Sequence, residues 1–465
     1  MYGTWGEIMS EWPAAGATIA AVATAVAFGQ GSVSIVRISG PKAETIARTI
    51  VRVPGRQIWD THRVLYGHVL AVEEYEHLDE VLLLLMRAPR SFTGEDVVEI
   101  HCHGGLMTVQ AVLERVLGQP GVRRALPGEF SQRAVLNGRL SLTQAEAISD
   151  LVAARSQRAA RMALAAMDGH IQTRVNILRN RLLEQLSQLE ARVDFEESLP
   201  LLDSEAVLQE LHSVRTELEE LVADTDRSRP VRHGLRVALI GRPNVGKSSL
   251  LNRLSRRERA IVTDLPGTTR DLLESEIILD GIPITLLDTA GIHNTEDVVE
   301  RLGIARSLAA LNGADLVVLI SDLQHGWTVE DNNLLQNIPG EIPRLIIGNK
   351  LDLASSFTNS NMRFDVLLSA LTGAGEDELV YAILQRCGAL YNQPLLLALN
   401  DRQRDLATAA VQALCSIEVT ANEQLPWDFW SIDLRQAVHS LGEITGQELT
   451  ESLLDRIFSR FCIGK

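Results

Sequence analysis

At residues 235–248 the chain reads Leu-Arg-Val-Ala-Leu-Ile-Gly-Arg-Pro-Asn-Val-Gly-Lys-Ser, an apolar run followed directly by a glycine-rich loop. The apolar run predicts a strand, and the glycines allow backbone N–H groups to converge on phosphate oxygens. The N-terminus of the helix that follows adds a favourable dipole. Lys247 is expected to neutralise the β- and γ-phosphates, and the Ser248 hydroxyl to bind Mg²⁺. The stretch therefore predicts a phosphate-binding loop.

Three further motifs follow in the order that a guanine-nucleotide site requires. Asp-Thr-Ala-Gly at 288–291 is expected to place an acid near Mg²⁺ and a glycine amide near the γ-phosphate. Asn-Lys-Leu-Asp at 349–352 provides the Asp352 carboxylate, which accepts two N–H groups from guanine, a pair that adenine does not offer. A charged hydrogen bond is worth roughly 1.5–3 kcal/mol, so Asp352 alone favours guanine by roughly 10–100-fold. Ser-Ala at 369–370 completes the base pocket.

The four motifs together predict a GTPase. The residues expected around its nucleotide are Asn244, Val245, Gly246, Lys247, Ser248, Ser249, Thr269, Asp288, Thr289, Ala290, Gly291, Asn349, Lys350, Asp352, Ser369 and Ala370.

One group that many GTPases carry is missing from the sequence. A water-positioning glutamine often follows the Asp-x-x-Gly motif, whereas this chain has Ile292 there. Hydrolysis then needs another way to orient water and another source of positive charge. The segment 263–271, between the phosphate loop and Asp288, reads Thr-Asp-Leu-Pro-Gly-Thr-Thr-Arg-Asp. We interpret it as a switch segment in which Thr269 is a candidate Mg²⁺ ligand.

The apolar pattern divides the chain into four parts and predicts an α/β multidomain fold. Residues 1–134 read as an N-terminal α+β domain, and residues 135–233 as the first part of a helical domain. Residues 234–388 alternate strand and helix, as expected of a Ras-like, doubly wound P-loop G domain. Residues 389–465 are expected to be helical to the last residue. The G domain therefore lies inserted between two parts of the helical domain.

Individual elements are also predicted. In the N-terminal part, strands are expected at 33–38, 79–86 and 97–103, and a helix follows to about residue 117. Apolar residues at helical spacing predict a long helix around 175–193. After a break at Pro200, Asp203 or Ser204 is expected to cap a second long helix.

Composition and charge limit the classes of protein. Of the 465 residues, 46% are apolar and 22% charged, as in ordinary globular domains. The formal net charge of −16 argues against binding nucleic acid by bulk charge, so such a contact needs a local basic patch. The four cysteines include no Cys-x-x-Cys pair, which fits a reducing cytoplasm. The uncharged stretch 12–36 is broken by Gly29 too early for a membrane span, and we expect a buried strand and loop there.

Together the motifs resemble those of the MnmE (TrmE) family of tRNA-modification GTPases, over nearly all of the chain. The terminal pentapeptide and the two N-terminal motifs are more specific than the G-domain motifs, which also occur in related GTPases. The matching segments are Gly-Arg-Pro-Asn-Val-Gly-Lys-Ser-Ser at 241–249, Gly-Thr-Thr-Arg-Asp at 267–271, Ser-Phe-Thr-Gly-Glu-Asp at 91–96, Pro-Gly-Glu-Phe at 127–130 and Phe-Cys-Ile-Gly-Lys at 461–465.

The resemblance implies a K⁺-activated GTPase whose G domains dimerise across their nucleotide faces. A cation near the β–γ bridge meets part of the electrostatic need that an arginine finger otherwise meets. Glu300 matches the family glutamate that helps to orient the attacking water, and Lys247 is the second catalytic candidate in this domain. Without the resemblance, Glu300 reads as a solvated helix acid. By motif match, the K⁺ ligands are Asn244, Thr263, Leu265 and Thr268.

The resemblance also implies that the N-terminal domain dimerises and binds a 5-formyl- or methylene-tetrahydrofolate as a one-carbon source. Arg37, Glu99, Arg139 and Lys465 fall on the family's folate-contacting positions. A carboxylate such as Glu99 suits the N–H groups of a pterin ring, and the basic groups suit glutamate carboxylates. The family usually has Pro-Pro-Gly-Arg-Gly-Gly before the strand that carries Arg37. Here residues 25–31 read Ala-Val-Ala-Phe-Gly-Gln-Gly, without that arginine.

Two cysteine-bearing segments each leave two interpretations open. Cys462, in the terminal motif of the family, is either a covalent catalyst at the uridine base or a small buried hydrophobe near a chain end. His101 and His103 lie on one strand face beside Cys102 and suggest a metal site. Two ligands are too few for such a site, so strand packing is the preferred interpretation.

In the family, the enzyme forms a homodimer and works in a heterotetramer with an FAD-dependent subunit, MnmG or GidA. Together they build an aminomethyl- or carboxymethylaminomethyl-type group at C5 of the wobble uridine of certain tRNAs, with ammonium or glycine as the amine donor. A cluster of arginines with a single acid between residues 151 and 183 is a candidate face for tRNA or for that partner. A solvated face, paired with the acidic stretch after Glu184, is the alternative. The cluster comprises Arg155, Arg158, Arg161, Arg174, Arg179 and Arg181.

Two other functions compete with tRNA modification. A GTPase switch of the ribosome-assembly type shares the G-domain motifs and Ile292, but it lacks the N-terminal domain and the terminal Cys-Ile-Gly-Lys. A GTP-independent folate enzyme would carry degenerate G-domain motifs, whereas those motifs are intact in this sequence.

Overall fold

The computed structural model describes residues 16–26, 31–72, 76–195, 203–257, 273–288, 313–354, 364–390, 398–448 and 450–464. The contacts within the chain group it into two compact units. One comprises residues 1–149 with residues 442–465, and the other comprises residues 150–441.

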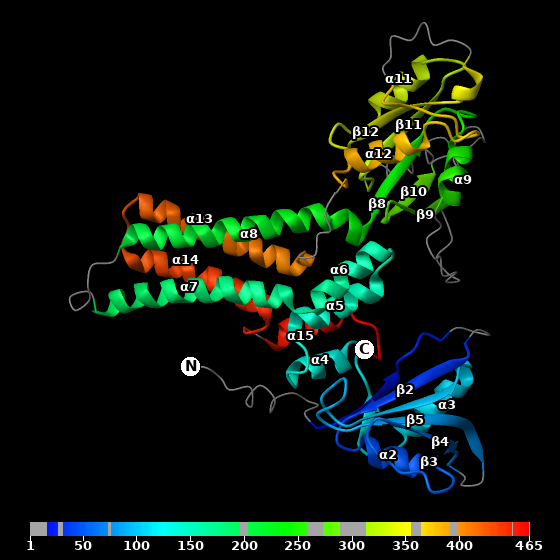
Figure 1. Cartoon of the computed structure of the whole chain (residues 1–465), viewed down its shortest axis with the longest axis vertical. Helices are drawn as coiled ribbons and strands as arrows, with labels where there is room; N and C mark the ends of the chain where they lie inside the picture. Colours follow the sequence, from blue (N-terminus) through cyan, green and yellow to red (C-terminus); the bar gives the residue numbers. More distant parts are fainter. Residues whose placement is uncertain are drawn as a thin grey trace, which may run out of the picture. The chain divides into compact units, whose positions relative to one another are not determined.

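A seven-stranded sheet forms the centre of the first unit (Figure 1), with the strand order β3-β4-β5-β6-β2-β1-β7. Neighbouring strands are antiparallel except β1 and β7, which are parallel. The expected strands at 33–38, 79–86 and 97–103 are confirmed, as is the buried strand near Ala20. The strands are β1 (Thr18–Val22), β2 (Val33–Ser39), β3 (Val51–Arg52), β4 (Arg63–Leu70), β5 (His77–Met86), β6 (Val97–His103) and β7 (Val122–Arg124).

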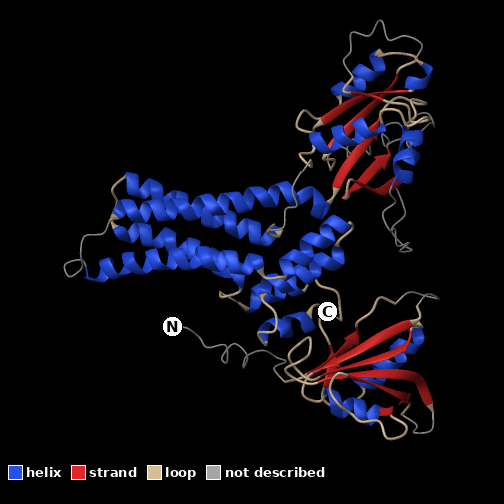
Figure 2. Cartoon of the chain, viewed as in Figure 1, coloured by secondary structure: helices blue, strands red, loops and turns tan. Residues whose placement is uncertain are grey.

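Two helices, α2 (Ala43–Ile50) and α3 (Leu106–Leu117), pack on one face of this sheet (Figure 2). Val36, Leu83 and Ile100 are fully buried in this layer. Because side chains alternate along a strand, the residues next to these three point to the opposite face. Part of that opposite face is also buried, because Ile19 and Ala21 of β1 pack there with Phe130.

The C-terminal residues complete the first unit. Helix α15 (Glu451–Phe458) packs on α4 (Glu129–Leu136), and its Phe458 joins Phe461 and Val135 in an apolar cluster. The helix ends at Phe458, so the expectation of helix to the last residue is wrong. The reason is tertiary: residues 459–464 pack on the N-terminal strands and loops, where a continued helix would lose these contacts.

Long helices make up the first part of the second unit. As expected, Asp203 caps one of them, because its side chain accepts a hydrogen bond of 3.0 Å from the Ala206 N–H. Ion pairs join neighbouring helices, among them Arg181–Glu210 at 2.6 Å between α7 and α8. The helices of this unit are α6 (Gln157–Met167), α7 (His170–Phe195), α8 (Ser204–His233), α13 (Asp401–Asn422) and most of α14 (Trp427–Thr445). Helix α5 (Leu142–Ala153) begins in the first unit and ends in the second.

The second part of this unit is a six-stranded sheet with the order β13-β12-β11-β8-β10-β9. All neighbouring strands are parallel except β9 and β10, so the predicted doubly wound fold is confirmed. The strands are β8 (Leu235–Ile240), β9 (Leu273–Leu279), β10 (Ile282–Asp288), β11 (Leu316–Asp322), β12 (Arg344–Asn349) and β13 (Val366–Leu367). The helical segments are α9 (Lys247–Arg257), α11 (Val329–Gln336), the short 3-10 turn η3 (Leu351–Leu353) and α12 (Glu376–Arg386).

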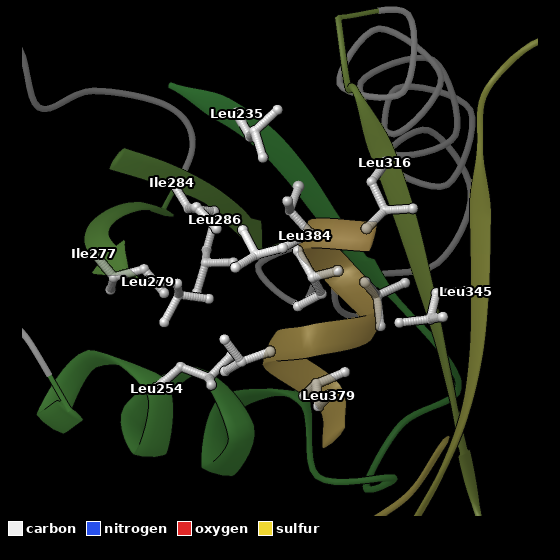
Figure 3. Packing of buried hydrophobic residues seen from close by; sticks show 14 of the residues in the cluster. Leu235, Leu254, Ile277, Leu279, Ile284, Leu286, Leu316, Leu345, Leu379 and Leu384 are labelled. Carbon is white, nitrogen blue, oxygen red and sulfur yellow. The ribbon is translucent and has the colours of Figure 1, made fainter. Parts of the chain in front are cut away.

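Helices cover both faces of the six-stranded sheet. Helices α9 and α12 lie on one face, where Leu254 and Leu379 pack against strand residues such as Leu286 (Figure 3). On the opposite face is a second buried cluster, which includes Ile338 just after α11 and against which Leu334 of α11 packs. Burial on both faces explains why β8 and β11 are continuous apolar runs.

Candidate functional site

The phosphate-binding loop leaves the sheet at the place where the strand order reverses. Strand β8 lies between β10 and β11, so the chain winds away from it in both directions. In doubly wound sheets, ligands bind outside the carboxyl ends of the strands at this point. Loop 241–246 begins there, directly after β8.

Two glycines give this loop its shape. Gly241 has φ +156°, and a Cβ at this position would lie 2.4 Å from the Ile320 carbonyl oxygen. Gly246 has φ +98°, and a Cβ there would lie 2.3 Å from the side-chain nitrogen of Asn349. Asn244 also adopts a left-handed conformation, with φ +61°. Only glycine satisfies both the conformation and the close approach at 241 and 246.

Lys247 lies at the start of α9 with its side chain buried in the loop. Only 6% of the residue is exposed. Its Nζ donates to the carbonyl oxygens of Gly241, at 2.6 Å, and Arg242, at 2.9 Å. Ser248 and Ser249 follow on the first turn of the helix and are exposed. An ammonium group and the N-terminus of α9 thus face the same loop, the arrangement that binds phosphate.

Asn349, the first residue of the Asn-Lys-Leu-Asp motif, connects that motif to the phosphate loop by a hydrogen bond. This residue is 2% exposed, and its Nδ2 donates to the Val245 carbonyl oxygen over 2.8 Å. Its Oδ1 accepts a hydrogen bond of 2.9 Å from the Ala370 N–H. Ser369 Oγ donates to Asp352 Oδ1 over 2.5 Å. The structure therefore brings together the phosphate loop, the Asn-Lys-Leu-Asp motif and the Ser-Ala motif.

Lys350 is held by two residues that the sequence analysis did not identify. Its Nζ donates to Asp322 Oδ2 over 2.7 Å, and His325 Nδ1 lies 2.9 Å from the same oxygen. Burial raises the pKa of the Asp322 carboxyl, but hydrogen bonds from Lys350 and His325 outweigh it and leave the pKa lowered. The only sequence signal for Asp322 is its position at the end of an apolar run, β11, which pairs with the strand that directly precedes Lys350.

Other predicted nucleotide residues lie outside the described residues. Strand β10 carries Asp288 at its end, paired in register with Leu239 of β8, so its backbone reaches the same edge of the sheet. The predicted residues that fall outside the described ranges are Thr263, Leu265, Thr268, Thr269, Thr289, Ala290, Gly291, Ile292 and Glu300.

In the first unit, Arg37 and Glu99 form an ion pair on the sheet face opposite α2 and α3. They lie directly opposite each other on β2 and β6, and Arg37 Nε contacts Glu99 Oε1 at 2.9 Å. The Arg37 guanidinium carbon lies 5.5 Å from the centre of the Phe92 ring and 5.6 Å from that of Phe130. His101 Nε2 lies 3.3 Å from the second Glu99 oxygen. The geometry gives a carboxylate and a guanidinium beside two aromatic rings.

The C-terminal tail reaches the same place. Arg37 Nη1 donates to the Gly464 carbonyl oxygen over 3.1 Å, and the Gly128 N–H to the Cys462 carbonyl oxygen over 3.4 Å. Cys462 is exposed, so its interpretation as a buried hydrophobe is wrong. The contacts of this segment with the unit are made by the Cys462 carbonyl oxygen and by the neighbouring residues Phe461 and Gly464. Arg139 is exposed, and Lys465 lies outside the described residues.

The histidines around Cys102 have separate partners. His103 Nδ1 contacts Asp79 Oδ1 at 2.6 Å, whereas His101 contacts Glu99. Burial raises the pKa of the Cys102 thiol to about 11, and the sulfur donates to the Ser34 carbonyl oxygen. Within the described part of the chain, no three His, Cys, Asp or Glu side chains gather as a metal site would require.

The predicted arginine cluster is partly neutralised. Arg181 pairs with Glu210 and, at 2.5 Å, with Glu217, and Arg174 also pairs with Glu217. Arg155 pairs with Glu276 at 2.9 Å. The structure therefore favours the second interpretation for these three arginines, a helix face whose charges are paired with acids. The acids lie on α8 and β9, however, and not in the stretch just after Glu184.

Among the residues that the structure describes, no helix is both long enough and apolar enough to span a bilayer.

A phosphate loop after the first parallel strand, a buried lysine and a guanine-type Asn-Lys-x-Asp motif tied to the loop define a P-loop GTPase. Two family models match the chain: "GTP-binding protein TrmE N-terminus" over residues 18–139 and "MnmE helical domain" over residues 142–462, a range that includes the nucleotide site. The chain is 68% identical to the tRNA modification GTPase MnmE of Synechococcus sp. (strain WH7803), over 96% of this chain and 98% of that protein. It is 65% identical to the protein of that name from Prochlorococcus marinus (strain MIT 9313), with the same coverage. The chain therefore belongs to the MnmE (TrmE) family.

Solved structures match about a third of the chain. Era of Aquifex aeolicus, crystallised with GDP and AlF4⁻, is 28% identical, with coverage of 38% of this chain and 66% of that chain and a TM-score of 0.28. The G domain of the T. maritima FeoB iron transporter is 28% identical, with coverage of 33% and 98% and a TM-score of 0.25.

Proposed function

We propose that the chain hydrolyses GTP and uses this cycle to modify the wobble uridine of certain tRNAs at C5, in the cytoplasm. The observation that carries the first part is the bridge that Asn349 makes between the phosphate loop and Ala370. It holds the phosphate and base halves of one guanine-nucleotide site together. Family membership, with relatives named tRNA modification GTPases at 65–68% identity, supports the second part.

Within this site, each chemical task has a residue. Lys247 neutralises the β- and γ-phosphates, Ser248 with Thr269 binds Mg²⁺, and Asp352 accepts the N–H groups of guanine. When bound, the Mg²⁺ ion neutralises charge on the phosphates. Glu300 orients the attacking water in place of the missing glutamine. The two hydrogen bonds that Lys247 Nζ donates to backbone carbonyls of the phosphate loop support its role.

K⁺ supplies positive charge near the β–γ bridge in addition to that of Lys247 and Mg²⁺. Asn244, exposed in the phosphate loop, and the switch residues Thr263, Leu265 and Thr268 are the proposed ligands, and two G domains meet across their nucleotide faces. The exposure and left-handed conformation of Asn244 in the loop support this assignment.

The first experiment is steady-state GTP hydrolysis in K⁺ and in Na⁺ buffer, for the natural protein and for Asn244→Ala. Stimulation by K⁺ that the substitution abolishes is expected. Asn244→Gly, which keeps the left-handed backbone without strain, separates the loss of the side chain from a backbone effect. Equal, slow rates in both salts would contradict the cation mechanism and favour a switch that needs an outside activator.

The N-terminal unit binds 5-formyl- or methylene-tetrahydrofolate beside Arg37 and Glu99, with Arg139 and Lys465 as further contacts. The ion pair, the two aromatic rings and the adjoining C-terminal tail support this site. Cys462 is exposed, which leaves its thiol accessible for a covalent role at the uridine base. Calorimetric titration with 5-formyltetrahydrofolate tests the assignment, and Glu99→Gln is expected to weaken binding.

The chain acts as a homodimer and joins the FAD-dependent MnmG (GidA) subunit in a heterotetramer. Val33, Val64, Tyr66 and Leu82 are exposed apolar side chains on the sheet of the N-terminal unit. An exposed apolar sheet face supports contact with a second copy of this unit. Light scattering of the natural protein and of Leu82→Asp tests it, because a charge there should convert the dimer to a monomer.

The domain boundaries remain those inferred from the sequence: 1–134, 135–233, 234–388 and 389–465. We propose, in addition, that residues 442–465 form part of the N-terminal folding unit, because their contacts group them with residues 1–149.

A further inference from the structure

We propose that Arg253 is a positioning residue for guanine recognition, which holds the loop 369–375 against the helix that begins at the phosphate site. The proposal rests on the function proposed above, because it concerns the base pocket of the same site. No motif in the sequence marks Arg253, which lies more than a full helical turn beyond Lys247 on α9.

The guanidinium of Arg253 makes contacts at three places around the start of α12. Its Nε contacts Glu376 Oε2 at 2.9 Å, in the first turn of that helix. Its Nη1 donates to the Leu371 carbonyl oxygen over 3.2 Å, and its Nη2 to the Thr372 carbonyl oxygen over 3.3 Å. One planar, fixed-geometry group thus binds both the loop and the helix after it.

Gly373 leaves the space that this contact needs. It has φ +90°, and a Cβ there would lie 1.9 Å from Arg253 Nη2 and 2.6 Å from Cζ. Any other residue would therefore displace the guanidinium. Gly375, two residues on, is also confined, since a Cβ there would lie 2.1 Å from the Leu367 carbonyl oxygen. The glycine at position 373 thus leaves room for the Arg253 guanidinium beside the loop.

The loop that Arg253 holds carries the base contacts. Ser369 Oγ donates to Asp352, and the Ala370 N–H donates to Asn349. The loop is closed on itself, because the Thr372 N–H donates to Ser369 Oγ over 3.2 Å. Movement of residues 371–373 therefore shifts the hydroxyl that orients the Asp352 carboxylate.

Helix α9, which carries Arg253, is held in the domain by buried apolar packing. Leu254, the next residue after Arg253, is fully buried and packs in the same apolar cluster as Leu379 of α12 (Figure 3). The first residue of α9 is Lys247. Arg253 consequently links the helix that faces the phosphates to the loop that faces the base.

The test is the preference for GDP over IDP, measured by calorimetry on the full chain. Inosine lacks the exocyclic amino group that one Asp352 oxygen accepts. The natural protein should therefore prefer GDP by roughly 10–100-fold. If Arg253 orients the base loop, Arg253→Ala reduces that preference to about a tenth, because small misplacement of a recognition group costs up to ~100-fold. A purely structural role would weaken GDP and IDP equally and leave the ratio unchanged.

Arg386→Ala is the matched control. Arg386 Nη2 contacts Asp365 at 2.9 Å in the same domain. Neither residue belongs to the loop 369–375 or to the phosphate loop 241–246. Its replacement should leave the GDP-to-IDP ratio at the natural value. A ratio lowered as much as in Arg253→Ala would overturn the proposal, since any lost arginine pair would then have the same effect.

Gly373→Ala tests the contact from the other side and serves if Arg253→Ala fails to fold. It should lower the ratio as Arg253→Ala does, and the two substitutions combined should lower it no further. Unchanged ratios in both single variants, or fully additive losses in the double variant, would overturn the proposal. A natural protein that binds no guanine nucleotide would instead overturn the proposed function.

Discussion

Asn349 donates a hydrogen bond of 2.8 Å to the carbonyl oxygen of Val245, so the base motif is fastened to the phosphate loop by a single buried side chain. The two residues lie 104 positions apart in the sequence. Because the same side chain accepts from the Ala370 N–H, one amide serves three motifs. Hydrogen bonds between motifs that are far apart in the sequence therefore hold the nucleotide site together.

Asn349→Ala should weaken the binding of both GDP and GTP. The substitution leaves the Val245 carbonyl and the Ala370 N–H unpaired, and each buried unpaired group costs about 1–3 kcal/mol. We expect affinity to fall at least ~10-fold, measured by calorimetry. Asn332→Ala is the control, because Asn332 is an exposed residue on α11 that accepts only from Trp327 in the contacts described. Equal affinities of the two variants would contradict the bridge.

Asp352→Asn should shift the preference from GTP to XTP. The carboxylate accepts N–H groups from guanine, whereas an amide also donates and so pairs with the carbonyl that xanthine carries. Hydrolysis rates with the two nucleotides give the preference, which we expect to change by roughly 10-fold or more. A variant that still prefers GTP would show that Asp352 does not read the base.

Glu300→Ala should lower turnover with little change in GTP affinity. A residue that orients the attacking water acts in the transition state, so its loss reduces kcat, by about 100-fold or more for such groups. Single-turnover hydrolysis and equilibrium binding separate the two effects. Weaker binding with normal turnover of bound GTP would assign Glu300 to the nucleotide pocket instead.

Glu129 should give the N-terminal unit a pH-dependent stability. It is 3% exposed. Burial raises the pKa of its carboxyl, but hydrogen bonds from Arg123, the Leu126 N–H and Arg133 outweigh that effect and lower it below the usual 4.5. The stabilisation is therefore present above pH 4.5 and is lost as the pH falls through the lowered value of the folded protein.

Glu129→Gln tests this dependence in urea titrations followed by tryptophan fluorescence. Breaking a buried ion pair costs about 3–5 kcal/mol, which we expect near neutral pH. The difference from the natural protein should shrink in acid, where both states of the natural protein are protonated. Glu114→Gln, at an exposed residue on α3 that accepts from Gln110, should change the free energy of unfolding by less than about 0.5 kcal/mol. A difference that does not vary with pH would contradict the charge-based explanation.

Gly464→Ala should weaken folate binding. A Cβ at Gly464, which has φ +95°, would lie 2.2 Å from the Val22 carbonyl oxygen and so push the tail away from β1 and from Arg37. Gly55→Ala is the control, because Gly55 has φ +76° but nothing within 4 Å of a Cβ. Calorimetry with 5-formyltetrahydrofolate should show a loss for Gly464→Ala alone. Equal losses in both variants would mean that backbone strain, not the position of the tail, matters.

Local signals in the sequence account for what could be predicted. The phosphate loop, the Asn-Lys-x-Asp motif and the strands that precede them are contiguous patterns, so their order alone indicated a doubly wound GTPase fold. Arg253, Asp322 and His325 could not be identified, because each acts on residues that lie far away in the sequence or carry no motif of their own. The end of α15 was predicted wrongly for the same reason, since contacts with N-terminal residues decide where that helix stops.

The placement of α15 in the N-terminal unit has a consequence for the order of folding during synthesis. The strands of that unit leave the ribosome first, yet the residues that cover Val135 and Leu142 come after the 150–441 unit. At about 5–20 residues per second, this gap lasts roughly 15–60 s. During that time the apolar surface under Phe458 and Phe461 stays uncovered while residues 150–441 are synthesised. A nascent chain therefore acquires its nucleotide site before its N-terminal unit can close.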